Sequence, residues 1–209
     1  MSSWIIGIFS ILTILLSTSP SNEFEGRIAI WEETPYDTTQ LDIYVKGNHV
    51  RVDIRAKEGG VDRTTIVDLN KSEVILISPN QKAYLYPQKI GPFNAKVAIN
   101  KSENKKIING QECIQWRVKE STTRDESAFW VTPMKMSFFE KLLAIYDPTE
   151  SNLRAFLMIP ARQGYFPMLY EERTFLRFEK KKIRVKEINR TTLSSDIFSI
   201  PKHYTLIRH

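Results

Sequence analysis

Apolar residues alternate with polar residues along much of this 209-residue chain, and this alternation restricts the possible folds more than any other feature. The clearest case is LDIYVKGNHVRVDIRA, residues 41–56, where Leu, Ile or Val recurs at every second position on both sides of Gly47-Asn48. Side chains of a strand point alternately to its two faces, so this spacing predicts an antiparallel hairpin with one buried and one solvated face. A mainly β fold follows.

Further segments of the same kind predict roughly eight to eleven strands in one antiparallel sheet. They cover residues 26–33, 63–69, 73–79, 82–87, 126–133 and most of 166–190. Residues 73–79, EVILISP, are apolar at both alternating sets of positions. A strand with two apolar faces is typical of the middle of a sheet, so we expect this strand to be central.

The only cysteine, Cys113, lies in KKIINGQECIQWRVKE, residues 105–120. Asn109-Gly110 is a strong hairpin signal, because both central residues of a type I′ turn need φ above zero. In the outgoing strand, Cys113 falls on the more polar face, opposite Trp116. A reactive thiol needs a base or an electropositive setting, and the neighbouring sequence contains neither. The pattern favours a structural cysteine, with a redox or catalytic role as the alternative.

Helical periodicity replaces the alternation over residues 137–146, SFFEKLLAIY. Ser137 and Glu140 have the spacing of a capping box, which predicts a helix start at this point. Residues 152–168 predict a second short helix that ends near Pro160. We therefore predict one α+β domain over 22–209, with one to three helices packed on the sheet.

The N-terminus has an apolar run from Trp4 to Leu16, followed by small and polar residues. This run is shorter than the roughly 20 residues that a membrane-spanning helix needs, and it predicts a signal peptide over residues 1–21. An uncleaved N-terminal anchor is the alternative, since no Lys or Arg precedes the run. Either interpretation predicts an exported protein, periplasmic or secreted. Because the chain has a single cysteine, we expect no internal disulfide.

Recognisable catalytic and metal-binding motifs are missing from the sequence. The three histidines, His49, His203 and His209, form no metal-binding pair, and no phosphate-binding or dinucleotide-binding glycine motif occurs. We expect no cofactor, no metal and no enzymatic activity. An enzyme would need His49 or His203 to meet Cys113, a serine or a carboxylate in one cleft.

Basic residues are concentrated in residues 177–190, where seven Lys or Arg accompany two Glu. The formal net charge of +6 favours anionic partners, but it is below the density of a dedicated nucleic-acid binder, and we expect no nucleic acid partner. One interpretation of 177–190 is peripheral contact with an anionic membrane. The other is a solvated edge strand, where lysines oppose aggregation.

Aromatic residues occur in almost every predicted strand and in the predicted helix. They are typical of an ordinary core, and they would also suit an apolar ligand held by a curved sheet, with helix 137–146 as a lid or plug. On the second interpretation the predicted lining residues are Trp31, Tyr44, Trp116, Trp130, Phe138, Phe139 and Leu142.

Short segments spread over nearly the whole mature chain resemble a known family. They are Phe24 and Gly26, YVKGNHVRVD (44–53), IVDL (66–69), SPNQKAYLY (78–86), IINGQECIQW (107–116), FWVT (129–132), GYFPM (164–168) and FSIPKHY (198–204). The pattern is similar to an exported bacterial family of unknown function whose fold looks like that of the periplasmic lipoprotein carriers and outer-membrane lipoprotein receptors, the Lol type. In this family style the cysteine lies in a hairpin with the pattern Ile-x-Gly-x-x-Cys. Ile108, Gly110 and Cys113 match that pattern here.

The resemblance implies a strongly curved antiparallel sheet, or incomplete barrel, with helices covering its concave apolar face. It implies a binding protein for a hydrophobic ligand, such as a lipid or a lipoprotein acyl chain. The functional residues of the carriers do not map onto this chain, so none is transferred. A different hypothesis uses the same fold with a filled cavity, as an envelope sensor or a module that binds an envelope protein.

Overall fold

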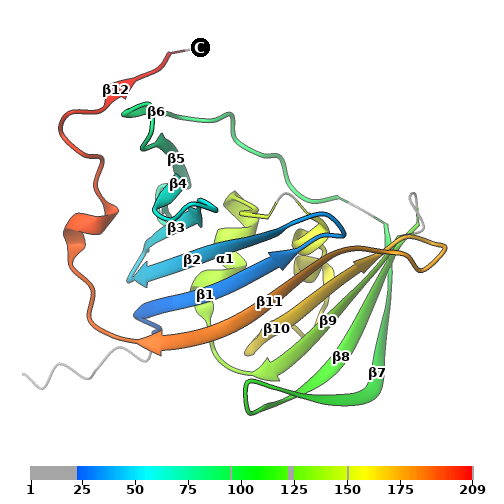
Figure 1. The fold of residues 1–209 in the computed structure, drawn as a ribbon. Helices are drawn as coiled ribbons and strands as arrows, with labels where there is room; N and C mark the ends of the chain where they lie inside the picture. Colours follow the sequence, from blue (N-terminus) through cyan, green and yellow to red (C-terminus); the bar gives the residue numbers. More distant parts are fainter. Residues whose placement is uncertain (1–22, 95, 122–124, 150, 209) are drawn as a thin grey trace, which may run out of the picture.

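The computed structural model describes residues 23–208, except residues 95, 122–124 and 150, so the signal peptide expected over 1–21 and His209 lie outside the described part. Within these residues, twelve strands form one sheet (Figure 1). The strands are β1 (Gly26–Glu33), β2 (Thr38–Lys46), β3 (His49–Arg55), β4 (Val61–Asp68), β5 (Glu73–Ser78), β6 (Ala83–Leu85), β7 (Val97–Ile108), β8 (Gln111–Glu120), β9 (Glu126–Pro133), β10 (Tyr165–Arg173), β11 (Glu179–Arg190) and β12 (Thr205–Leu206).

The strand order is β12-β6-β5-β4-β3-β2-β1-β11-β10-β9-β8-β7, so the first and last long strands, β1 and β11, pair in the middle. Neighbours are antiparallel, apart from the parallel contact of β12 with β6. The predicted mainly β fold with an open, curved sheet is confirmed (Figure 1). The strand number exceeds the prediction because β12 has only two residues, too few to show alternation.

Two sequence-based predictions about strand position are wrong. β5, predicted to be central, is the third strand from one edge, and most of its residues are only half-buried. β11, for which an edge position was one interpretation, lies between β1 and β10. Alternation shows which faces of a strand are wet, but it does not show which strands are its neighbours.

The predicted turn at Asn109-Gly110 is confirmed, with φ of +48° and +75° at the two positions. The turn also makes a long-range contact. The side-chain Nδ2 of Asn109 donates to the backbone carbonyl oxygens of Val185 at 2.7 Å and Lys186 at 3.1 Å. These residues adjoin a register shift in β11, so the β7–β8 hairpin tip is fastened to a strand four places away in the sheet.

One α-helix, α1 (Ser137–Ile145), and two 3₁₀-helices, η1 (Asn152–Met158) and η2 (Ser195–Phe198), occur in the described part of the chain. The helix over 137–146 is confirmed, but its capping box is wrong. The N-cap is Met136, without a side-chain hydrogen bond. Glu140 instead accepts from Nε of Arg162 at 2.8 Å, because the loop after η1 passes beside α1. No described helix combines the length and apolar character needed to cross a bilayer.

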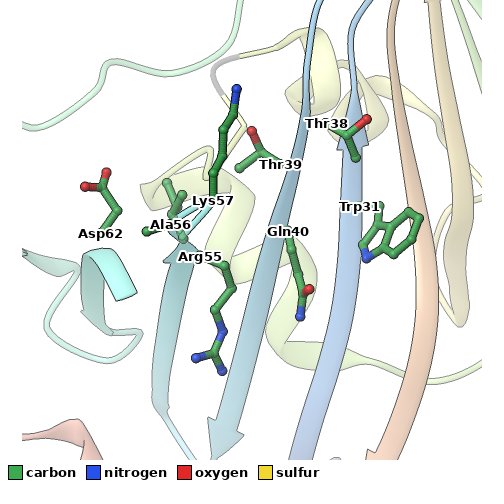
Figure 2. Close-up of a pocket in the computed structure, with 9 residues that line it drawn as sticks. Trp31, Thr38, Thr39, Gln40, Arg55, Ala56, Lys57 and Asp62 are labelled. Carbon is green, nitrogen blue, oxygen red and sulfur yellow. The ribbon is translucent and has the colours of Figure 1, made fainter. Parts of the chain in front are cut away.

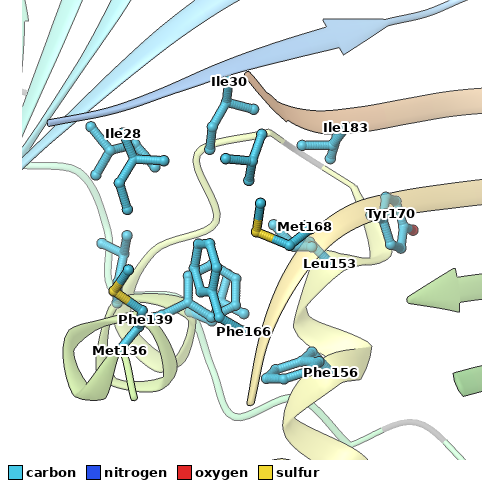
Figure 3. Close-up of a cluster of buried hydrophobic side chains, with 14 of the residues drawn as sticks. Ile28, Ile30, Met136, Phe139, Leu153, Phe156, Phe166, Met168, Tyr170 and Ile183 are labelled. Carbon is cyan, nitrogen blue, oxygen red and sulfur yellow. The ribbon is translucent and has the colours of Figure 1, made fainter. Parts of the chain in front are cut away.

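Aromatic rings join the helices to one face of the sheet, which we call the inner face and which carries Ile28, Ile30, Phe129 and Val131. Figure 3 shows part of this core, with side chains from β1, β10, β11, α1 and η1. The ring of Phe139 in α1 lies 5.8 Å from that of Phe156 in η1 and 5.1 Å from that of Phe166 in β10. Such interlocking apolar contacts stabilise the fold through burial and close packing.

Candidate functional site

Four of the seven predicted ligand-binding residues lie in the packed core on the inner face. Trp116, Phe138, Phe139 and Leu142 are each at most 5% exposed. Trp116 stacks on Phe156 with ring centroids 6.5 Å apart, and Phe138 stacks on Phe24 at 5.9 Å. These side chains are thus occupied by contacts within the protein.

The other three predicted residues, Trp31, Tyr44 and Trp130, are on the opposite, outer face. Each follows or precedes an inner-face residue of its strand, and adjacent strand residues point to opposite sides. Lys186 Nζ lies 3.8 Å from the Trp31 ring centroid, and Trp130 Nε1 donates to Glu171 at 3.1 Å. Tyr44 accepts a hydrogen bond from Arg55 at 3.3 Å. The structure therefore does not bring the seven residues together.

A groove of about 500 Å³ lies where the C-terminal turn of α1 faces the β4–β5 turn and the segment after β6. We call it the α1–β5 groove. Its apolar lining comes from Val74, Tyr86, Pro87, Ile90, Ala144, Ile145 and Tyr146, and its polar lining from Lys71, Ser72, Glu73, Gln88 and Lys89. Val74, Ile145 and Tyr146 also pack against the hydrophobic core, so the groove borders the core on its inner-face side.

The groove has apolar walls and a charged rim. The Tyr146 hydroxyl accepts from Thr65 Oγ1 at 3.2 Å, which orients the ring that forms one wall. The Lys71 backbone amide donates to Asp68, and this contact holds the pKa of Asp68 below its usual value although burial opposes it. Lys71 Nζ lies 3.5 Å from the same carboxylate and remains 73% exposed. An apolar chain with an anionic end would match this distribution of groups.

A second hollow, about 510 Å³ in volume, lies beside Trp31 near the end of β1, the start of β2 and the end of β3. Its lining is more polar than that of the α1–β5 groove. Trp31, Gln40 and Arg55 project side by side from three neighbouring strands, and Lys57 and Asp62 lie beyond them (Figure 2). Lys57 is engaged with Asp37 at 2.9 Å. This hollow has no paired carboxylates or histidine that would serve acid–base chemistry among its lining residues.

Buried carboxylates on the outer face are paired with arginines. Asp42 is fully buried and accepts from Arg27 at 2.7 Å and from Arg55 at 2.5 Å. Asp53, 3% exposed, accepts from Arg51 at 2.8 Å and from the Thr64 hydroxyl at 2.6 Å. A buried charge needs such compensation, and both carboxylates receive it from side chains of their own or neighbouring strands.

Cys113 is fully buried and belongs to the hydrophobic cluster, so its surroundings are less polar than its predicted face suggested. Its sulfur lies 3.6 Å from the carbonyl oxygen of Gln111. Burial raises the thiol pKa to about 11, which is opposite to the shift that activates a nucleophile. His49 lies instead beside Asp68 and Phe198, and His203 packs against Tyr204. Within the described ranges, no cluster of three His, Cys, Asp or Glu side chains could hold a metal ion.

A protein family described as "Domain of unknown function (DUF4412)" matches residues 24–204. The chain belongs to the DUF4412 family. This confirms the resemblance to a family of unknown function that the sequence motifs indicated. No curated protein matches this DUF4412 chain.

Solved structures show what this DUF4412 fold is similar to. An uncharacterized conserved protein from Thermus thermophilus superposes with a TM-score of 0.55 and 10% identity, covering 88% of this chain and 89% of that one. A DUF1329 family protein from Desulfovibrio piger gives 0.39 at 7% identity, covering 86% and 91%. A putative outer membrane lipoprotein-sorting protein domain from Vibrio parahaemolyticus gives 0.32 at 11%, covering 82% and 87%. At these identities the likeness concerns the fold, and the last two superpositions are too loose to bear on a ligand.

The residues of the α1–β5 groove were not among the predicted site residues of this DUF4412 protein. Ile145 and Tyr146 lie in the helix expected over residues 137–146, and Tyr86 lies in the strand expected over residues 82–87. Their signal was amphipathicity, which a core residue and a groove residue share. Only the packing of α1 over part of the inner face leaves its last turn uncovered.

Proposed function

We propose that this protein is an exported, non-enzymatic binding protein that holds a hydrophobic ligand, such as a lipid or a lipoprotein acyl chain, in the α1–β5 groove. The observation that carries the proposal is the apolar groove of about 500 Å³ beside the core. Its volume is within the range of sites for small ligands, roughly 300–1,000 Å³. In this proposal α1 and η1 cover most of the concave face, and the ligand takes the part they leave open.

An acyl chain suits the apolar side of the groove. Val74, Ile90 and Ile145 would remove methylene groups from water, and each buried methylene contributes about 0.8 kcal/mol. Lys71 and Lys89 on the rim would attract an anionic headgroup or carboxylate. The proposed location is the periplasm or the exterior, and this part rests on the N-terminal apolar run and on the family resemblance.

Filling the groove tests the proposal. Ala144 is exposed on α1 and lines the groove, so Ala144→Trp should occupy ligand space without entering the core. We expect uptake of a fluorescent fatty acid by the exported protein to fall about tenfold. The matched control is Lys141→Trp, which places the same ring on an exposed position of α1 that lies outside the groove.

The Lys141→Trp control distinguishes filling of the groove from a general disturbance of α1. Equal uptake by wild type and both variants would contradict binding in the groove, and equal loss in both variants would point to disturbance of α1 instead. Native mass spectrometry of protein purified without detergent from its own envelope fraction provides a second test. We expect an added mass that fragments to an acyl lipid or an acylated peptide.

A second candidate function is an envelope sensor or protein-interaction module with a filled interior. The dense packing around Phe138, Phe139 and Leu142 favours it, because these residues offer no open volume. A clean apo mass from the envelope fraction, together with no fatty-acid uptake by wild type, would select this alternative over the carrier.

A further inference from the structure

Three large apolar side chains are exposed together on the loop between β10 and β11. Phe175, Leu176 and Phe178 are 63%, 62% and 68% exposed. We call residues 174–178 the β10–β11 tip. Scattered apolar residues on a surface are ordinary, but three within four positions at the end of a hairpin form a local apolar projection.

Backbone hydrogen bonds give this tip a defined shape. The Thr174 amide donates to the Phe178 carbonyl at 2.9 Å, and the Arg177 amide donates to the Thr174 carbonyl at 2.8 Å. Arg177 completes the turn with φ of +67°. Because the loop closes on its own backbone, its apolar side chains project outward and do not fold back onto the sheet.

A basic pocket of about 200 Å³ adjoins the apolar projection. It is lined by Arg117, Lys119, Glu126, Arg173, Thr174, Phe175 and Arg177, so four cationic side chains accompany one carboxylate. Glu126 is 3.6 Å from Arg117. Lys119, Arg173 and Arg177 form no ion pair with any residue that the structure describes. Among the described residues, three of the four cations that line the pocket are therefore left without an ion-pair partner.

Three of the four lysines of β11, by contrast, are each paired with a carboxylate. Lys180 lies 2.7 Å from Glu172, Lys181 lies 2.7 Å from Glu32, and Lys182 lies 3.1 Å from Glu179. Of the seven cations in residues 177–190, Arg177 thus lies at the tip with cations from β8 and β10, and Lys186 lies over the Trp31 ring instead.

We propose that the β10–β11 tip docks the protein on an anionic phospholipid bilayer. Phe175, Leu176 and Phe178 enter the region between headgroups and acyl chains, and the basic pocket receives a phosphate headgroup. An apolar projection beside unpaired cations matches a lipid surface, which offers negative charge directly above hydrocarbon. The tip and its basic pocket share no residue with the α1–β5 groove. Membrane docking by the tip can therefore be tested independently of ligand binding in the groove.

Vesicle co-sedimentation of the exported protein tests the docking, with wild type and variants sharing the same N-terminus. Wild type should bind vesicles of equimolar phosphatidylcholine and phosphatidylglycerol, and bind phosphatidylcholine alone much more weakly. Arg173→Gln/Arg177→Gln and Phe175→Ser/Phe178→Ser should each weaken binding to the mixed vesicles about tenfold or more. Added salt should weaken wild-type binding, because it screens the cationic pocket.

Matched controls remove the same chemistry elsewhere on the surface. Lys202→Gln/Arg208→Gln removes two exposed cations near β12, which forms one edge of the sheet, several strands from β10 and β11. Ile107→Ser/Ile207→Ser removes two exposed apolar side chains. Both should bind like wild type. Equal weakening in the controls and the tip variants would overturn the proposal, as would the absence of wild-type binding to the anionic vesicles.

Site-specific fluorescence tests which part of the protein contacts the vesicle surface. Cys113 is fully buried, so a thiol-reactive nitrobenzoxadiazole dye should label native Leu176→Cys at the new position and leave the wild type unlabelled. Anionic vesicles should shift the emission of labelled Leu176→Cys to the blue, and leave that of labelled Ile107→Cys unchanged. The reverse pattern, or inorganic phosphate abolishing the shift with no dependence on lipid charge, would overturn docking by the tip.

Discussion

At the scale of single residues, Gly26 occupies a backbone position that a side chain cannot share. Its φ is +149°, and a Cβ atom added there would lie 2.1 Å from the carbonyl oxygen of Asn189. This contact is the β1–β11 pairing at the middle of the sheet. The Phe24 and Gly26 motif recognised in the sequence is therefore a requirement for strand approach.

We predict that Gly26→Ala lowers the free energy of unfolding by about 2–4 kcal/mol. Gly59→Ala is the matched control, since Gly59 also has a positive φ of +95° but has no atom within 4 Å of an added Cβ. It should cost only about 1 kcal/mol. Urea denaturation measures both, and equal losses would show that strand approach does not set the requirement at Gly26.

Asp147, between α1 and η1, is a half-buried residue whose carboxyl group is only partly compensated by hydrogen bonds. Burial raises its pKa, although hydrogen bonds from the amide and hydroxyl of Thr149 oppose that shift. Its second oxygen, Oδ2, is buried and has no hydrogen-bond partner among the residues that the structure describes. The folded state thus holds the proton more tightly than the unfolded state, and stability contributed by this group is lost as pH rises through its raised pKa.

We predict that Asp147→Asn, which resembles the protonated acid at every pH, stabilises the protein by on the order of 1 kcal/mol at neutral pH. The gain should vanish below the ordinary Asp pKa of 3.8 and grow as pH rises above it. Thermal unfolding from pH 3 upward measures the profile. A gain that does not change with pH would mean that the Asp147 charge is not its cause.

At the scale of elements, the β7–β8 hairpin joins a local turn to a distant strand through Asn109. We predict that Asn109→Gly, which keeps φ above zero but loses the two bonds to Val185 and Lys186, costs about 1 kcal/mol. Asn109→Ala should cost about 2 kcal/mol, because alanine also disfavours φ of +48°. Chemical denaturation of Asn109→Gly and Asn109→Ala separates the contribution of the two hydrogen bonds from that of the turn conformation. If both variants lost the same free energy of unfolding, the positive φ at Asn109 would make no contribution to stability.

α1 shows how far local patterns describe an element. Helical periodicity predicted its span as residues 137–146, and the structure agrees within one residue. Its predicted cap failed, since Glu140 binds Arg162 from a loop over twenty residues later in the chain. A cap competes with tertiary partners for the same carboxylate, and that competition is invisible in a local window.

At the scale of the whole molecule, the extent of the helices determines which part of the inner face stays open. α1 and η1 bury the inner face near Phe129 and Phe166, and they leave the β5 side beside Tyr146 open. The predicted lining residues were chosen for aromatic character, and they divide between the core and the outer face. Aromatic character favours burial anywhere, so it cannot select the one place where burial is incomplete.

Alternation, turn residues and helical spacing by themselves determined the mainly β class, the β2–β3 and β7–β8 hairpins and the position of α1, because these depend on neighbours within a few residues. The tertiary structure alone decided that β11 lies beside β1, that Cys113 is buried and that cations from β8 and β10 meet at the β10–β11 tip. These features depend on which surfaces pack together, and the same alternating pattern is compatible with many such pairings.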